Sequence, residues 1–370
     1  MQNKTGAIVA IDPSTGEILA MVSAPSYDPN LLVGRGFRKN YADLVLNDSL
    51  RPLNNRALRA DYRPGSIFKL VQSLIGLQEK VITPYTGFSC NKYPIGCHNH
   101  EYPSDIKKAI KHSCNPYFYN VFKRIILQDH SISVFKESRI GLTKWHTYVN
   151  HFGFGTRLNT DIPGVRTGRI PDTSFYDNWY GKNRWAFSMF YSNAIGEGEL
   201  AVSPLQIANL GAILANKGYY YEPHFVTKKE INGIWKDVVY EKKNVGIDEE
   251  YFPFILEGMV EVVKPGGTAR RAAIKNIEVA GKTGTIQNGS FRDHSAFVAF
   301  APVENAKIAI SVYVEYAGFG GTYAAPIASL MMEKYLKDSI TNVYEENRIL
   351  DAVIEKGKPI RSLKTGKPIN

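Results

Sequence analysis

The sequence has 370 residues, of which 45 are Lys or Arg and 35 are Asp or Glu, so its formal net charge is +10. Hydrophobic residues make up 44% and charged residues 22%, which is typical of globular proteins and excludes a disordered or collagen-like chain. The positive charge is compatible with binding to nucleic acid, with an anionic membrane surface, or with no specific partner. However, the sequence contains no zinc-finger array, aromatic RNA-binding signature or basic zipper, so we expect no binding to nucleic acid.

The length of the chain predicts roughly two to three domain-sized units. The N-terminus has neither the basic start nor the long apolar stretch of a signal peptide. No apolar run approaches about 18 residues, the length that a membrane-spanning helix needs. Two explanations stay open at this point: a cytoplasmic protein, or a fragment without its targeting segment.

The first predicted elements form a hairpin. Residues 6–11 and 17–23 are short apolar strands, and residues 12–16 between them (Asp-Pro-Ser-Thr-Gly) have strong turn chemistry. Residues 25–65 are rich in Pro, Asn, Gly and Arg and show little periodicity, which predicts a long irregular excursion. From Ser66 onward, apolar residues recur with helical spacing.

Helices dominate the middle of the chain and strands return towards its end. Further helices are predicted over residues 104–127 (interrupted at 113–116), 131–138, 203–216 and 249–263, with a long loop or lid over 160–195. Strands are predicted over residues 277–284, 294–301 and 307–316, followed by a helix over 323–337.

This order of elements predicts an α/β (α+β) fold. One antiparallel sheet would be built from both ends of the chain, from about residues 5–25 and 275–337, with a helical subdomain of about residues 66–220 inserted into it. We expect one domain over residues 1–337. Residues 338–370 would be a basic tail, solvated and mobile.

Ser66 and Lys69 open the first predicted helix, directly after a Pro-Gly pair. A spacing of three residues places both side chains on one helix face. A serine hydroxyl is a weak nucleophile until a base takes its proton, and a lysine whose pKa is lowered by burial can be that base. The alternative is an ordinary helix cap followed by a solvated lysine.

Two more short motifs follow. Ser113 and Asn115 stand two residues apart at a helix break, where a hydroxyl and a carboxamide can point into one cleft; the alternative is a helix cap. Lys282, Thr283, Gly284 and Thr285 lie on a predicted strand. Gly284 would allow close approach of another backbone, and an amine beside two hydroxyls would hold a carboxylate. The alternative is an exposed strand.

The order and wide spacing of these three motifs carry more weight than any one of them. S-x-x-K, then S-x-N, then K-T-G resembles the penicillin-binding transpeptidases, which share a fold with the serine β-lactamases. The resemblance covers roughly residues 5–337 and is greatest for the class B enzymes of the elongation type called penicillin-binding protein 2. The segments that carry it are residues 12–22, 63–69, 194–198, 203–206, 280–285, 293–297, 300–302, 317–321 and 324–328.

The resemblance implies a transpeptidase catalytic domain and a role for each motif residue. Ser66 would attack a D-Ala-D-Ala stem peptide of peptidoglycan, Lys69 would be its base, and Ser113 with Lys282 would relay the proton. Asn115 would orient the acyl chain.

The K-T-G segment would bind the end of the substrate. Thr283 and Thr285, on either side of Gly284, would take the terminal carboxylate. The backbone N–H groups of Ser66 and Thr285 would form the oxyanion hole. The acyl transfer itself would need no cofactor.

The resemblance also implies a cellular setting. β-Lactams would acylate Ser66, and crosslinking of stem peptides would serve cell elongation and shape. The full-length protein would work with a membrane glycosyltransferase of the SEDS type at the periplasmic face of the inner membrane. The chain would then be an excised catalytic domain, and its lack of a signal and a membrane span would reflect truncation.

All three cysteines of the chain lie close together. Cys90, Cys97, His100 and Cys114 form a set of three thiols and one imidazole, which suits a closed tetrahedral Zn²⁺ site. Some elongation-type relatives are similar, with zinc held by Asp, His and Cys beside the S-x-N motif. A disulfide with one spare thiol, or three free thiols, are the alternatives, and His98 competes with His100 as the ligand.

Three other functions stay open. A serine β-lactamase would need a carboxylate that activates water, and no motif in the sequence singles out such a residue. A penicillin-sensing receptor domain would be acylated without catalysing a reaction. A cytoplasmic structural or nucleic-acid protein would carry the motifs by chance.

Overall fold

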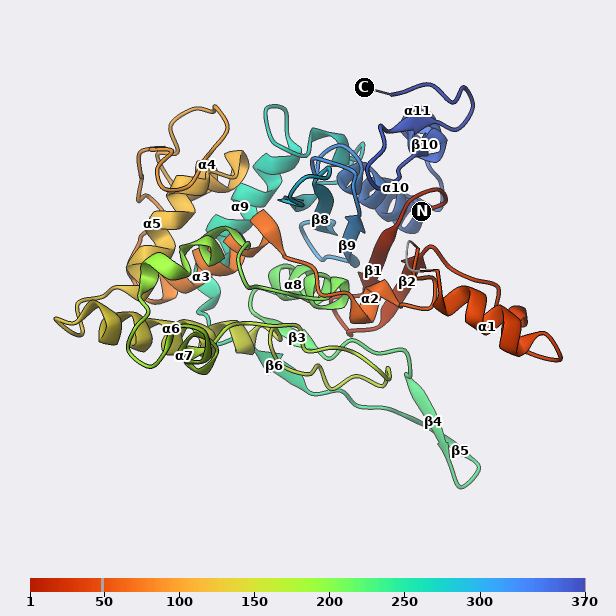
Figure 1. Cartoon of the computed structure of the whole chain (residues 1–370), viewed down its shortest axis with the longest axis horizontal. Coiled ribbons are helices and arrows are strands. Elements are labelled where there is room, and N and C mark those ends of the chain that lie inside the picture. Colours follow the sequence, from red (N-terminus) through yellow and green to blue (C-terminus); the bar gives the residue numbers. More distant parts are fainter. Residues whose placement is uncertain (48–49, 370) are drawn as a thin grey trace.

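A five-stranded antiparallel sheet joins the two ends of the chain (Figure 1). The computed structural model describes residues 1–47 and 50–369. The strand order is β2-β1-β9-β8-β7, so strands from the first 25 residues pair directly with strands from the last third. The strands are β1 (Gly6–Ile11), β2 (Ile18–Ala24), β7 (Ala280–Ile286), β8 (His294–Ala301) and β9 (Ile308–Val314). The predicted α/β fold and its antiparallel sheet are confirmed.

The predicted first hairpin is present. The backbone N–H of Ser14 donates to the Asp12 carboxylate at 2.8 Å, and Gly16 has a left-handed φ of +87°. The short polar turn therefore closes on itself, and β1 and β2 pair on either side of it. Every residue of β1 is buried, because β1 lies between β2 and β9 in the sheet.

Two helices cover opposite faces of the sheet. Ser311 in β9 donates to the carbonyl of Pro204, at the start of α8 (Pro204–Ala215). Ser295 in β8 accepts from the N–H of Ala324, at the start of α10 (Ala324–Lys337). Ser311 pairs with Val298, which is three residues from Ser295. Since side chains alternate along a strand, the two serines point to opposite faces.

Most of the helices in the middle of the chain gather beside the sheet (Figure 1). They are α3 (Lys69–Gln78), α4 (Ile106–His112), α5 (Asn115–Ile126), α6 (Val134–His151), α7 (Thr173–Tyr180) and α9 (Phe252–Val263). Helix α9 packs against both α4 and β7, and so connects this helical region to the edge of the sheet.

Helix α6 is longer than the predicted 131–138. Beyond the predicted end at residue 138, it carries Leu142, Trp145 and Val149, which are fully buried at helical spacing. Gly141 lowers the helix propensity of the sequence at this point. The structure uses it for a close approach, because a Cβ there would lie 2.0 Å from the carbonyl oxygen of Ile126. Tertiary packing therefore extends the helix beyond its sequence signal.

The two segments predicted as irregular contain short elements. Residues 25–65 hold a 3-10 turn (Pro29–Leu32), α1 (Phe37–Val45), which has no buried residue, and α2 (Arg56–Arg59). Residues 160–195 hold α7 and two 3-10 turns (Phe187–Met189 and Tyr191–Ile195). Four short strands follow α8: β3 (Tyr219–Tyr221), β4 (Lys228–Ile231), β5 (Ile234–Asp237) and β6 (Lys242–Asn244).

The C-terminal segment is not the solvated tail that its composition predicts. It forms α11 (Val343–Asp351), β10 (Ala352–Val353) and β11 (Arg361–Ser362). Ile349, Ile354 and Ile360 are buried, and the ammonium of Lys4 donates to the carbonyl of Ala352 at 2.8 Å. The apolar residues of this segment pack against the N-terminal part of the chain, and their burial holds the segment on the fold although it is rich in lysine and arginine. Within residues 1–47 and 50–369, every helix is too short or too polar to cross a membrane.

Candidate active site

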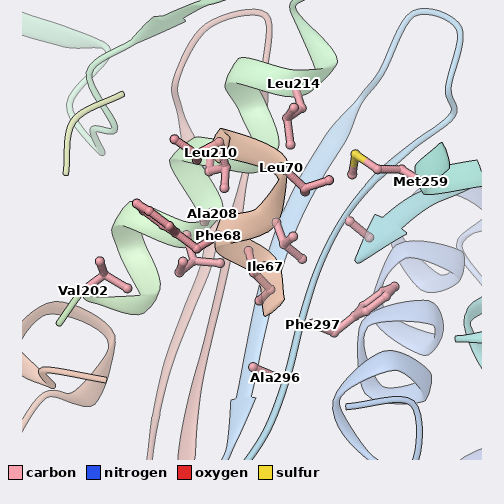
Figure 2. Packing of buried hydrophobic residues seen from close by; sticks show 14 of the residues in the cluster. Ile67, Phe68, Leu70, Val202, Ala208, Leu210, Leu214, Met259, Ala296 and Phe297 are labelled. Carbon is pink, nitrogen blue, oxygen red and sulfur yellow. The ribbon is translucent and has the colours of Figure 1, made fainter. Parts of the chain in front are cut away.

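Ser66 lies in a tight turn whose neighbours belong to the core. It sits in a 3-10 turn (Gly65–Phe68) that runs into α3, and the next two residues, Ile67 and Phe68, are buried. Figure 2 shows Ile67 and Phe68 among residues of α8, α9 and β8. The core therefore anchors the segment, while Ser66 itself stays partly exposed and lines a cleft.

A close backbone contact holds this turn from the other side. The N–H of Gly65 donates to the carbonyl of Gly196 at 2.9 Å. Gly196 has φ +77°, and a Cβ there would lie 2.0 Å from the carbonyl oxygen of Gly65. Only glycine meets both conditions, so Gly196 fixes the position of the Ser66 turn.

Lys69 and Lys282 are fully buried and meet at one hydroxyl. The Lys69 ammonium donates to the Ser113 hydroxyl at 3.1 Å and to the Asn115 side-chain carbonyl at 2.6 Å. The Lys282 ammonium donates to the same Ser113 hydroxyl at 2.8 Å. Ser113 therefore bridges two lysines that lie 213 positions apart (282 − 69) in the sequence.

Burial lowers the pKa of both lysines. The pKa of Lys69 falls to about 7, chiefly because burial penalises the ammonium, while the nearby Cys97, Cys114 and Glu197 oppose the shift. The pKa of Lys282 also falls well below its usual value, through burial first and repulsion from Lys69 second. A lysine with a pKa near neutrality can accept a proton, which an ordinary surface lysine cannot do.

The break between α4 and α5 points Ser113 and Asn115 into the cleft. Ser113 ends α4 with a left-handed φ of +54°, and α5 begins at Asn115, with Pro116 in its first turn. The Asn115 amide donates to the carbonyl of Gly96 at 2.7 Å. The chain reverses within two residues, and both side chains reach Lys69.

Strand β7 brings the third motif to the cleft. Thr283 and Thr285 line the cleft, and Lys282 points to Ser113. Gly284 faces the Ser66 turn, since a Cβ there would lie 3.2 Å from the carbonyl oxygen of Pro64 and 3.3 Å from the side chain of Ile67. Because β7 is the edge strand of the sheet, its outer side is free to face a ligand.

The structure thus brings the three sequence motifs into one cleft of about 480 Å³. It also adds residues that the motifs did not single out. Thr268 is hydrogen-bonded to Thr283 at 2.8 Å between their hydroxyl oxygens, and Gly320 donates to the Thr285 hydroxyl at 3.4 Å. The only local signal for Thr268 is its place after a Gly-Gly turn. The cleft is lined by Ser66, His98, Ser113, Asn115, Thr268, Thr283, Thr285, Gln287, Asp293, Phe319, Gly320 and Gly321.

The cysteine cluster lies directly behind the S-x-N motif. One ligand atom from each of Cys90, Cys97, His100 and Cys114 lies within 4.8 Å of all the others. The Nε2 atom of His100 is 3.4 Å from both the Cys90 and the Cys97 sulfur. The Nδ1 atom of His100 is 2.7 Å from the carbonyl oxygen of Glu101, which leaves Nε2 for a metal. The geometry selects His100, whereas His98 lines the cleft.

The three cysteines are free thiols in the structure. Three thiols and one imidazole within 4.8 Å of one another are the ligand types and number of a closed structural zinc site. The residues present therefore fit a zinc ion.

Comparison with known proteins agrees with this geometry. Residues 6–333 match the family model of the penicillin-binding protein transpeptidase domain. The peptidoglycan D,D-transpeptidase MrdA of Haemophilus influenzae is 32% identical over 374 residues, covering 92% of this chain and 54% of that protein. MrdA of Acinetobacter baumannii is 31% identical over 365 residues, covering 91% and 51%. The chain spans about half the length of these relatives.

Solved structures give the same result. Pseudomonas aeruginosa PBP2 in complex with WCK 5153 aligns with a TM-score of 0.73 and 34% identity, covering 92% of this chain and 76% of that one. An imipenem acyl-enzyme complex of penicillin-binding protein A from M. tuberculosis aligns with a TM-score of 0.72 and 25% identity, covering 90% and 75%. The chain therefore belongs to the penicillin-binding protein transpeptidases, in the class B, PBP2 type.

Proposed function

We propose that this chain is the catalytic domain of a peptidoglycan D,D-transpeptidase that acts through an acyl-enzyme on Ser66. One observation carries the proposal: two fully buried lysines, Lys69 and Lys282, share the Ser113 hydroxyl beside Ser66. The MrdA relatives, which are peptidoglycan D,D-transpeptidases by name, support the same activity.

Acylation begins with Lys69. As a neutral amine it takes the proton of the Ser66 hydroxyl, and the serine oxygen attacks the carbonyl carbon of the penultimate D-Ala. The peptide C–N bond to the terminal D-Ala then breaks, and the proton passes through Ser113, with Lys282, to the nitrogen of that leaving D-Ala. The hydrogen bonds from Lys69 and Lys282 to Ser113 support this relay, because they connect the base to the leaving-group side.

The substrate would be bound on both sides of the peptide bond that is cleaved. The terminal carboxylate would bind the hydroxyls of Thr283 and Thr285, and the Asn115 amide would orient the acyl chain. The backbone N–H groups of Ser66 and Thr285 would stabilise the oxyanion. Close packing supports this pairing, since a Cβ on Gly65 would lie 3.4 Å from the carbonyl oxygen of Thr285.

The acyl-enzyme is resolved by an amine. The amine of a second stem peptide attacks the ester carbonyl carbon, a C–N bond forms, the bond to Ser66 Oγ breaks, and the proton returns to the serine. A β-lactam opens on Ser66 in the same way but leaves a slow ester. The acyl-enzyme structure of the M. tuberculosis neighbour supports this acylation.

The cysteine cluster is proposed as a structural zinc site. Cys90, Cys97, His100 and Cys114 would hold the ion, which would fasten the loop of residues 90–100 to Cys114 and take no part in acyl transfer. Asn115 shows what the cluster positions: its N–H donates to the Cys97 sulfur at 3.4 Å, and its side chain reaches Lys69. The cluster thereby holds the S-x-N motif in register with the first motif.

The cellular setting follows from the same proposal. The activity would serve cell-wall elongation and shape at the periplasmic face of the inner membrane, with a membrane glycosyltransferase of the SEDS type as partner. A structure titled as a peptidoglycan synthase complex that coordinates polymerization and crosslinking aligns with a TM-score of 0.74 and supports such a partner. The division into a catalytic domain over residues 1–337 and a segment over 338–370 stays a prediction.

Labelling with a fluorescent penicillin tests the function. The unsubstituted chain should form a stable adduct, and Ser66→Ala should form none. Absence of label from the unsubstituted chain would contradict the proposal. Rapid turnover of nitrocefin would instead indicate a β-lactamase. Acylation without release of D-Ala or crosslinking of any stem peptide would indicate a penicillin sensor.

A further inference from the structure

A second cavity, of about 800 Å³, adjoins the active-site cleft and has no part in the chemistry described so far. Its volume lies within the range of about 300–1,000 Å³ that is usual for small-ligand sites. Thr268, Phe319 and Gly321 line both hollows and form the partition between them. Because Thr268 also bonds to Thr283, the cavity begins immediately beyond the proposed carboxylate subsite.

Four arginines line this cavity: Arg270, Arg271, Arg292 and Arg348. They come from three separate segments, namely the turn after α9, the loop between β7 and β8, and α11. The described lining contains no Asp or Glu. Within residues 1–47 and 50–369, Arg348 pairs with Glu345, whereas Arg270, Arg271 and Arg292 have no carboxylate partner. The cavity therefore has an excess of positive charge.

Three of these arginines lie close enough to the buried side chain of Tyr323 to affect its pKa. Burial raises the pKa of Tyr323, while Arg348, Arg292 and Arg271 oppose that shift, so all three guanidiniums act on the same side chain. Arg348 lies over the Tyr323 ring at 5.1 Å from its centroid. Guanidiniums that lack a carboxylate suit bidentate binding of an anionic ligand.

The rim of the cavity is apolar and exposed. Phe319 is 74% exposed and Tyr344 is 79% exposed. Ile360 and Ile369, from the C-terminal segment, complete the lining. A ligand with carboxylates and short hydrocarbon stretches, such as a peptide, matches this combination better than a bare phosphate does.

We propose that this cavity binds the acceptor stem peptide through its carboxylates. The inference rests on the proposed function. The leaving D-Ala departs from the Thr283 side of the cleft, and the acceptor amine must approach the ester from the same side, because aminolysis retraces the path of the leaving amine. Beyond Thr283 and Thr268, the acceptor chain extends into the four-arginine cavity. The C-terminal segment thus helps to build a substrate site.

The test measures acceptor binding to protein already acylated by penicillin, so that no chemistry is needed. The probe is a fluorescein-labelled tripeptide with one free amine and two free carboxylates. The comparison peptide is identical except that both carboxylates are replaced by carboxamides. We expect the carboxylate peptide to bind the acylated chain at least tenfold more tightly than the carboxamide peptide. Arg271→Gln/Arg292→Gln and Arg270→Gln/Arg271→Gln should each remove that preference.

The matched control is Arg35→Gln/Arg38→Gln, which changes two exposed arginines near and on α1 and should keep the preference. Equal binding of both peptides to the unsubstituted chain, or a preference that survives both cavity variants, would overturn the inference. Binding of anionic phospholipid vesicles, in place of the peptide and lost in the cavity variants, would overturn it in favour of a membrane surface. Failure of penicillin to acylate the unsubstituted chain would instead reject the proposed function.

Discussion

The ammonium nitrogen of Lys282 lies 2.8 Å from the hydroxyl oxygen of Ser113, although 169 positions separate the two residues in the chain. Lys282 lies on the edge strand of the sheet and Ser113 at a break between two helices, so this contact joins the two halves of the cleft. The same hydroxyl accepts from Lys69. The contact makes Ser113 the shared element of the proposed relay.

Ser113→Ala should slow acylation of Ser66 by penicillin about 100-fold or more, the usual contribution of a positioned acid–base group. The variant removes the oxygen between the two lysines and leaves the backbone intact. The second-order rate constant of labelling by a fluorescent penicillin measures the effect. Ser26→Ala, at an exposed position, is the control and should label normally. A Ser113→Ala rate equal to that of the control would contradict the relay.

Acylation should rise with pH through neutrality. The base must be neutral to accept a proton, and burial lowers the pKa of Lys69 to about 7. Below that pH the ammonium predominates, so the rate should fall roughly tenfold for each further pH unit. Above it the rate should level off. Labelling rates across neutral pH, with circular dichroism to verify the fold, test this. A rate that does not vary between acid and neutral pH would exclude Lys69 as the base.

Thr283→Val should weaken binding of substrates that end in a carboxylate. The variant keeps the shape of the side chain and removes the hydroxyl of a residue that lines the cleft. Loss of one hydrogen bond to a charged group should raise KM for a D-Ala-D-Ala peptide about tenfold or more. Release of D-Ala over a range of peptide concentrations measures it. Thr147→Val, on the exposed side of α6, should leave KM unchanged. An unchanged KM for Thr283→Val would place the carboxylate elsewhere.

Gly196→Ala should damage both folding and acylation. The new methyl group would lie 2.0 Å from the carbonyl oxygen of Gly65, and the residue would also be strained at φ +77°. Gly164→Ala is a matched control, because Gly164 has φ +78° with nothing within 4 Å of the added methyl. We expect the control to lose only about 1–2 kcal/mol from strain. Urea unfolding should show a larger loss in the free energy of unfolding for Gly196→Ala than for Gly164→Ala. Equal losses would mean that the contact with the Ser66 turn is unimportant.

The purified chain should contain one zinc ion. Elemental analysis should find it in the unsubstituted protein, with loss in Cys114→Ser, because removal of one thiolate opens the tetrahedral set. His98→Ala should keep the metal, since His98 stands outside the set. Removal of zinc by a chelator should lower the melting temperature. It should also slow acylation, because the S-x-N motif would lose its support. Protein purified without a chelator and found free of zinc would refute the site.

The sequence by itself predicted the sheet and the three motifs, because these depend on local signals. The strand over residues 6–11 is encoded by a short continuous apolar run, and the turn after it by the Asp-Pro-Ser-Thr-Gly segment; β1 lies there. The start of α8 is encoded by a Ser203 cap with Pro204, and the structure forms the complete capping box. The motif order S-x-x-K, S-x-N and K-T-G indicated the family that the comparisons show.

Long-range packing decided the rest. Composition predicted a solvated C-terminal tail, yet Lys4 and the buried isoleucines hold that segment on the fold, where it lines the four-arginine cavity. Sequence spacing could not show that Lys69 and Lys282 share Ser113, or that Thr268 touches Thr283. These pairs are made by sheet register and helix docking between distant segments. A buried lysine acquires its lowered pKa only when that packing removes it from water.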